Sequence, residues 1–125
     1  MENRAKLLED SLLVIWNNRD SASRLTAMKD VYASNIAFYE TNESEAIRGY
    51  EAINETIAKL QAQWPLESQF ELTAPSNKNH EVQHVAWRLG VPGEVPVATG
   101  MDVAVIENQK IKLLYLFLNA PETKN

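Results

Sequence analysis

The two histidines are the side chains best suited to acid–base chemistry near neutral pH, because imidazole ionises in that range. His80 follows a polar segment of turn composition, Ser76 to Asn79, and we expect it to be solvated. His84 lies in a predicted strand on the opposite parity to Val85 and Trp87. If those two residues face the core, His84 faces the outer surface of a sheet; a catalytic His84 is the alternative.

Metal and cofactor sites have little support in the sequence. The two histidines are separated by residues of a turn and a strand, without helical register and without a third ligand. The chain has no cysteine, which excludes disulfides, thiolate nucleophiles and zinc sites built on sulfur. Its four glycines form neither a phosphate-binding loop nor a dinucleotide-binding fingerprint. We therefore expect no metal and no cofactor.

Aromatic side chains are candidates for the wall of a ligand pocket, although aromatic residues at helical or strand spacing more often belong to the core. The candidates are Trp16, Tyr32, Tyr39, Trp64 and Trp87. Core packing is the expected role of Trp64.

The composition is that of a globular chain of one domain. Of its 125 residues, 45% are hydrophobic and 23% are charged. The net charge is −5 and the basic residues are scattered, which disfavours nucleic acids and anionic membranes as partners. The longest apolar run, Leu113 to Leu118, is far shorter than the ~20 residues that a membrane helix needs. Residues 1–10 lack the apolar core of a signal peptide, so we expect a cytoplasmic protein.

Helical spacing dominates the first half of the chain. Apolar residues recur at i, i+4, i+7 and i+8 across residues 8–16, which predicts a first helix. Asp20 or Ser21 can cap a second helix, which carries its own apolar stripe. A third helix is predicted from Tyr50 onward and is expected to stop at Pro65, which cannot continue the backbone hydrogen bonds.

The second half of the chain has the period of strands. A short hairpin is predicted from residues 36–39 and 46–47, and four longer strands are predicted at 70–73, 81–88, 98–106 and 111–119. Helices therefore come first, and a meander of strands follows. This segregation predicts an α+β fold with an antiparallel sheet, because a parallel sheet would need a crossover helix between successive strands.

Both faces of the strand predicted at 111–119 are apolar. Leu114, Leu116 and Leu118 point to one side, and Leu113, Tyr115 and Phe117 point to the other. Three helices can cover only one face of the sheet, and an uncovered outer set would be an unusual apolar patch for a monomer. We therefore expect a homodimer that pairs through the outer sheet face.

Four segments, in their order and spacing, carry a resemblance to a known superfamily. They are Trp16-Asn17-Asn18-Arg19-Asp20, Tyr32-Ala33-Ser34-Asn35, Arg48-Gly49-Tyr50-Glu51-Ala52-Ile53, and Gly100-Met101-Asp102-Val103 ahead of Gln109-Lys110-Ile111. Together they resemble the nuclear transport factor 2-like superfamily, in its branch of ketosteroid isomerases and SnoaL-like polyketide cyclases. The similarity spans nearly the whole chain. It implies one nuclear transport factor 2-like (SnoaL-like) domain over residues 1–125.

This resemblance implies a cystatin-like roll, in which a cone-shaped, curved antiparallel sheet packs on three N-terminal helices and encloses an apolar pocket. Trp16 and Tyr32 would lie on the elements that roof the pocket, with Trp87, Leu12 and Leu116 as further lining residues. The superfamily contains isomerases, cyclases, dehydratases, hydrolases and non-catalytic modules, so the fold does not carry a function with it.

The resemblance to ketosteroid isomerases also implies two catalytic carboxyl groups. The general base of that family falls on Glu40, and the protonated aspartic acid of its oxyanion hole falls on Asp102 if the turn at residues 107–109 absorbs one deletion. The oxyanion-hole tyrosine falls on Leu12, which cannot donate a hydrogen bond. The alternatives are a surface Glu40 beside a turn and an Asp102 that faces solvent or an arginine.

Three functions remain open at this stage. The first is a cofactor-independent enzyme of the isomerase, cyclase or dehydratase type, in which Glu40 or Asp102 moves a proton on a small hydrophobic carbonyl compound. The second is a non-catalytic protein that binds a small hydrophobic ligand, and the third is a dimerisation module whose cavity is filled by side chains. Leu12 in place of a tyrosine favours the second function over a true isomerase.

Overall fold

The computed structural model describes residues 4–119, and the α+β class with its N-terminal helices is confirmed there. The helical elements are α1 (Lys6–Asp10), the π-helix η1 (Ser11–Trp16) that continues it, α2 (Ser21–Val31) and α3 (Tyr50–Gln61). The strands are β1 (Tyr32–Tyr39), β2 (Ile47–Arg48), β3 (Gln69–Leu72), β4 (Asn77–Asn79), β5 (Val82–Gly90), β6 (Ala98–Glu107) and β7 (Lys110–Leu118). No helix within this range is long and apolar enough to span a membrane.

The strands form one sheet in the order β2-β1-β7-β6-β5-β3, with β4 also paired to β5. The pairs are antiparallel as expected, apart from β1 and β7, which run parallel with Tyr32 opposite Ile111. The sheet is therefore mixed. The expectation of a wholly antiparallel sheet considered only successive strands, whereas α3 and the strands β2 to β6 separate β1 from β7 and supply the long connection that parallel pairing needs.

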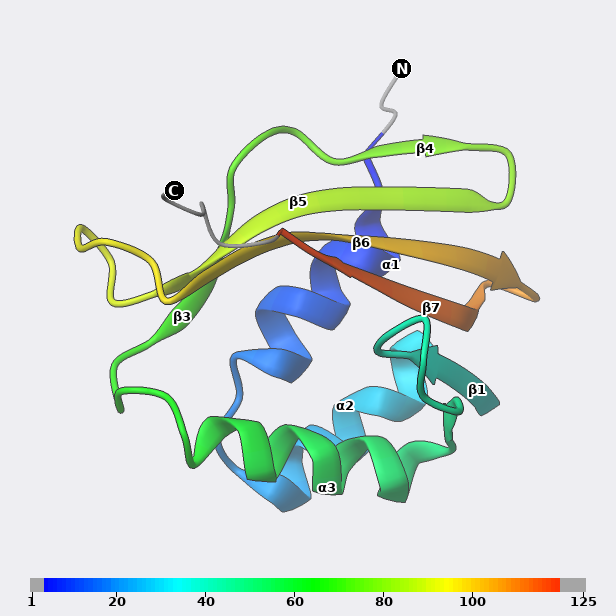
Figure 1. Cartoon of the computed structure of the whole chain (residues 1–125). Coiled ribbons are helices and arrows are strands. Elements are labelled where there is room, and N and C mark those ends of the chain that lie inside the picture. Colours follow the sequence, from blue (N-terminus) through cyan, green and yellow to red (C-terminus); the bar gives the residue numbers. More distant parts are fainter. Residues whose placement is uncertain (1–3, 120–125) are drawn as a thin grey trace.

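The helices lie against one face of the twisted sheet, and the core fills the space between them (Figure 1). Alternate residues of β5 point into this core, so Val85 and Trp87 are buried while His84 on the opposite parity is exposed. His80 is also exposed, in the turn between β4 and β5. Both histidines thus lie away from the core, as their sequence context predicts.

Three local elements differ from the sequence-based expectations. The first helix changes from α to π geometry at Ser11, which apolar spacing alone does not reveal. The third helix ends at Gln61 and not at Pro65, because two turn hydrogen bonds, from Gln63 N to Leu60 O and from Trp64 N to Gln61 O, close the chain there. Strand β4 is entirely exposed and polar, so it carries no apolar alternation.

Polar side chains tie the helices to one another and to the sheet. The Asn17 side-chain amide bonds the backbone of Phe70 in both directions, with Phe70 N to Oδ1 at 2.7 Å and Nδ2 to Phe70 O at 3.1 Å. This amide holds β3 to the end of η1. Buried Arg24 of α2 donates to Asn18 O at 2.8 Å and to Gln61 Oε1 of α3 at 2.9 Å. The end of η1, α2 and α3 are thereby fixed around the site described below.

Candidate functional site

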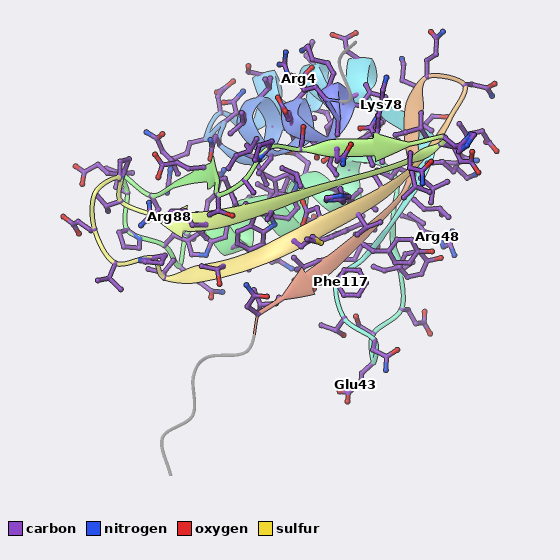
Figure 2. All side chains as sticks on the ribbon, turned by 90° about the horizontal axis from the view of Figure 1, so that it is seen from above. Arg4, Glu43, Arg48, Lys78, Arg88 and Phe117 are labelled. Carbon is purple, nitrogen blue, oxygen red and sulfur yellow. The ribbon has the colours of Figure 1, made fainter. Side chains whose placement is uncertain are left out.

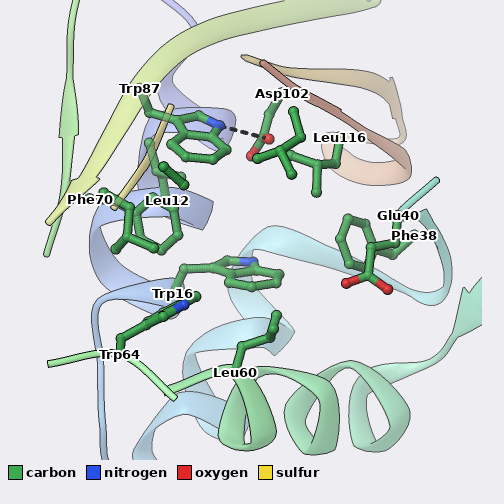
Figure 3. A pocket seen from close by; sticks show the side chains of 13 residues that line it. Leu12, Trp16, Phe38, Glu40, Leu60, Trp64, Phe70, Trp87, Asp102 and Leu116 are labelled. Carbon is green, nitrogen blue, oxygen red and sulfur yellow. Dashed lines mark hydrogen bonds between the residues drawn. The ribbon is translucent and has the colours of Figure 1, made fainter. Parts of the chain in front are cut away.

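A cavity of about 190 Å³ lies between the helices and the sheet (Figure 3). Its lining is largely aliphatic and aromatic, and the residues are Leu12, Trp16, Phe38, Glu40, Leu60, Trp64, Phe70, Trp87, Leu89, Ala98, Asp102, Leu116 and Leu118. An apolar cavity of about 150 Å³ is enough to admit benzene, so this one has room for a ring-sized ligand. Among the lining residues only Glu40 and Asp102 have carboxyl groups, and no lysine, arginine or histidine lines the cavity.

Asp102 reaches the cavity from the middle of β6, where it lies between Val85 of β5 and Leu116 of β7. The residue is 7% exposed, and Trp87 Nε1 donates a hydrogen bond to its Oδ1 at 3.0 Å. Burial raises the pKa of the Asp102 carboxyl to about 7, although the Trp87 hydrogen bond acts in the opposite direction. Near neutral pH this carboxyl can therefore hold or release a proton.

Trp87 can reach Asp102 because the residue opposite it in the sheet is a glycine. Gly100 pairs with Trp87 across β5 and β6, and a Cβ atom at this position would lie 2.7 Å from the indole ring. The missing side chain leaves the indole free to lie over β6 with its N–H toward Oδ1. A larger residue at position 100 would push the ring away and remove the hydrogen bond on which the orientation of the carboxyl depends.

Glu40 follows the end of β1 and lines the cavity from the same sheet as Asp102, with β7 between their two strands (Figure 3). It follows Tyr39, whose ring lies on the other face of the sheet and stacks on Tyr115 with centroids 4.8 Å apart. Glu40 is partly exposed, in contrast to Asp102. The cavity thus brings together the two predicted carboxyl groups, one in contact with solvent and the other buried.

Trp16 projects from the π-helix into the cavity, and its orientation is held by Tyr32. Trp16 Nε1 donates to the Tyr32 hydroxyl at 3.2 Å, and Ser11 Oγ lies 2.6 Å from the same oxygen. Tyr32 is fully buried and does not line the cavity, which differs from the expected pocket role. Its hydroxyl is used behind the cavity wall, and burial raises the pKa of that hydroxyl above its ordinary value.

The remaining predicted lining residues, Leu12, Trp87 and Leu116, lie on the cavity. Leu12 presents an aliphatic side chain to the cavity, so it cannot donate a hydrogen bond there. Trp64, expected in the core, also lines the cavity and packs edge-to-face on Phe70 at 5.5 Å.

Sequence reasoning missed several lining residues. They are Phe38, Leu60, Phe70, Leu89, Ala98 and Leu118. Strand parity could have found Phe38, because it alternates with Tyr39 and so points to the opposite face. Leu60 and Phe70 carry no such signal, since the spacing that places them inward is the same for core and for cavity.

The site offers carboxyl groups for proton transfer but no cluster of metal ligands. Within residues 4–119 no three His, Cys, Asp or Glu side chains lie close enough to hold a metal ion. A partly exposed carboxylate and a buried carboxyl with a raised pKa are suited to act as a base and a proton donor, respectively. The apolar walls exclude water, and this would strengthen the electrostatic interaction of each carboxyl group with a bound ligand.

Comparison with known proteins identifies the fold. No protein-family model matches this chain, and no curated protein sequence matches it. A protein from Agrobacterium tumefaciens, described as a candidate isomerase of the SnoaL-like family, has a similar structure with a TM-score of 0.82 and 21% identity. That similarity covers 96% of this chain and 100% of the other.

Two further solved structures agree with this result. A candidate SnoaL-like polyketide cyclase from Jannaschia sp. CCS1 has a TM-score of 0.73 and 12% identity, over 91% of this chain and 83% of its own. A candidate ketosteroid isomerase from Kribbella flavida has a TM-score of 0.70 and 13% identity, over 96% of this chain and 80% of its own. The chain therefore has the fold of these SnoaL-like and ketosteroid isomerase-like proteins, the nuclear transport factor 2-like fold.

Proposed function

We propose that this protein is a cofactor-independent enzyme that moves a proton on a small hydrophobic carbonyl compound bound in the cavity. The observation that carries the proposal is the position of Asp102, which is buried in an apolar wall and accepts a hydrogen bond from Trp87 at Oδ1, while Glu40 lines the same cavity. The isomerases and cyclases among its structural neighbours are candidate assignments, and they agree with this reaction class.

The two carboxyl groups would have separate roles. The Glu40 carboxylate would take a proton from the carbon next to the ligand carbonyl, and the electron pair of that C–H bond would move toward the carbonyl oxygen. Neutral Asp102 would donate a hydrogen bond to this oxygen, because Trp87 N–H already occupies Oδ1 and leaves Oδ2 to carry the proton. The proton held by Glu40 would then return to the same carbon or to another one, so the enzyme ends unchanged.

The test is exchange of the α-protons of small cyclic ketones with D₂O, followed by NMR in the presence of the protein. We expect exchange to fall by roughly 10²–10⁴-fold in Glu40→Gln and by roughly 10²–10³-fold in Asp102→Leu, which removes the hydrogen-bond donor; these are the usual contributions of a general base and an oxyanion donor. Glu55→Gln, which alters an exposed carboxylate on α3, is the matched control and should exchange at the wild-type rate. Equal exchange in all four proteins would refute the assigned roles.

A non-catalytic ligand-binding protein is the second candidate, and one specific observation favours it. The resemblance places an oxyanion-hole hydroxyl at Leu12, which has none, and the Tyr32 hydroxyl is bonded to Ser11 and Trp16 behind the wall. If ketones bind with similar affinity to the wild type, Glu40→Gln and Asp102→Asn while none of the three exchanges protons, this second function is the correct one.

We also propose that two copies pair through the outer face of the sheet. Phe117 is 58% exposed on β7, close to the loop that carries Glu43 (Figure 2). Partly exposed Leu113 and Tyr115 lie on the same face of β7, at alternate positions. A pairing of two such faces would bury apolar side chains that the helices cannot reach.

A further inference from the structure

The cavity offers a ligand many hydrogen-bond acceptors and few donors. Its lining contains two carboxyl groups and no lysine, arginine or histidine. Two of its three indole N–H groups are already used, one by the Tyr32 hydroxyl and the other by Asp102 Oδ1. An anionic ligand would therefore find no positive partner among the lining residues, and a ligand that only accepts hydrogen bonds would depend on a protonated carboxyl.

The walls of the cavity are rich in the side chains that attract cations. All three tryptophans of the chain line it, together with two phenylalanines, Phe38 and Phe70. Phe70 makes edge-to-face contacts with Trp16, Trp64 and Trp87, at centroid distances of 6.1, 5.5 and 5.0 Å. The face of an indole ring carries negative potential, and tryptophan is the best aromatic partner for a cation, especially where water is excluded.

Asp102 lacks a positive partner within the described part of the chain. Its one hydrogen bond there is from Trp87 to Oδ1, and none of the ion pairs involves it. A buried carboxylate without a counter-ion is costly, so it must either take up a proton or gain a cation. The cavity beside Oδ2 is the place from which that cation would come.

We propose that the cavity binds a small hydrophobic ammonium ion, with its positive centre against Asp102 Oδ2 and the indole rings of Trp16 and Trp87. The alkyl groups of the ion would lie against the leucines that complete the wall. This proposal goes beyond the proposed function, because it requires an open cavity but no proton transfer. The cavity would select a positively charged ligand over a neutral ligand of the same shape.

The charge of Asp102 gives the binding a defined pH dependence. The titratable groups near it are the Tyr32 hydroxyl, which is close enough to be influenced by Asp102, and Glu40, which lines the same cavity. The elements η1, α3, β3, β5 and β7 contribute only neutral side chains to the lining. As Asp102 loses its proton, a cation should bind more tightly, whereas a neutral acceptor such as a ketone should bind less tightly.

The test compares choline with 3,3-dimethylbutan-1-ol, a neutral molecule of the same shape in which carbon replaces the nitrogen. Both are titrated into the protein while intrinsic fluorescence is followed, because every tryptophan lines the cavity. At about pH 8.5 we expect choline to bind roughly tenfold more tightly than the alcohol, and this preference to shrink toward about pH 5.5. Asp102→Asn should abolish the pH dependence, whereas Glu55→Gln should retain it.

A second variant distinguishes the loss of a cation–aromatic contact from a general loss of folding, because only the former affects choline and not the alcohol. Trp16→Leu keeps an apolar wall but removes one indole, so it should weaken choline binding several-fold and leave the binding of the alcohol nearly unchanged. If the alcohol binds as tightly as choline at both pH values, or if only ketones bind, the proposal is wrong while the ligand-binding cavity stands. If neither these probes nor ketones bind, the proposed function fails as well.

Discussion

Asp102 links the chemistry of the cavity to the stability of the whole chain. Its pKa is about 7 in the folded protein against an ordinary value of 3.8, so the folded state keeps a proton that the unfolded state has lost. The contribution of Asp102 to the free energy of unfolding therefore falls as pH rises from about 4 to about 7, and is constant above that. We expect Asp102→Asn to match the wild type near pH 4 and to be more stable at pH 8, by on the order of 4 kcal/mol.

Urea unfolding at a series of pH values measures this difference. Asparagine keeps an oxygen for the Trp87 N–H, so the comparison changes the charge and little else. Glu55→Gln controls for the loss of one negative charge at the surface. Parallel stability curves for the wild type and Asp102→Asn would show that Asp102 is ionised in both states.

The Tyr32 hydroxyl is expected to stabilise the wall of the cavity from behind. Tyr32→Phe leaves Trp16 Nε1 and Ser11 Oγ without their buried partner, and an unsatisfied buried polar group costs about 1–3 kcal/mol. We expect the variant to unfold at lower urea concentration and to bind cavity ligands more weakly, because the Trp16 ring is no longer held. Tyr115→Phe, on the outer face, is the matched control and should be close to the wild type. A Tyr32→Phe protein with wild-type stability would contradict this account.

At the scale of the elements, burial patterns explain what the sequence could predict. Helix α2 begins where its cap was expected, and strands β5 and β6 lie within a few residues of their expected bounds because more and less buried positions alternate along them. Strand β7 lies equally close to its expected bounds because of its continuous apolar run. The π geometry of η1, the polar strand β4 and the parallel pairing of β1 with β7 depend on contacts between distant segments. The spacing of apolar residues along the chain cannot predict such contacts.

The same distinction applies to the site. Glu40 and Asp102 both line one cavity, because the first directly follows β1 and the second lies in β6 of the same sheet, while their catalytic roles stay predictions. The resemblance did not predict that Tyr32 turns its hydroxyl toward Ser11, because that direction is decided by the packing of η1 against β1. A side chain can be assigned to an element from sequence, but its hydrogen-bond partner is a property of the packed structure.

Arg24 of α2 joins the end of η1 to α3, and both η1 and α3 contribute lining residues to the cavity. It is 1% exposed, and its guanidinium donates to backbone and amide oxygens, including Gln61 Oε1, without a carboxylate in the group. Arg24→Met should therefore leave several buried acceptors unsatisfied and lower the free energy of unfolding by about 3 kcal/mol or more. Arg48→Met, at an exposed position of β2, should change it by no more than about 0.5 kcal/mol. Thermal or urea unfolding of both variants checks this, and equal effects would show that the buried network contributes little.

At the scale of the whole molecule, the outer sheet face predicts self-association. Phe117→Ser should shift the protein from dimer to monomer in sedimentation velocity at micromolar concentration, because it removes the most exposed side chain of the face on β7. Val95→Ser removes an even more exposed side chain, 88% exposed, from the loop between β5 and β6, and should leave the dimer intact. A wild-type protein that sediments as a monomer would contradict the interface itself.

The parallel pairing of β1 with β7 has a consequence for the time at which this sheet forms. During synthesis, β1 and the helices leave the ribosome long before the strand that lies between β1 and β6. Until β7 follows, β1 presents an open edge that other extended chains can pair with, and closing so long a loop is slow. Newly made chains are therefore most exposed to aggregation just before β7 inserts, and a holding chaperone would have its greatest effect at that stage.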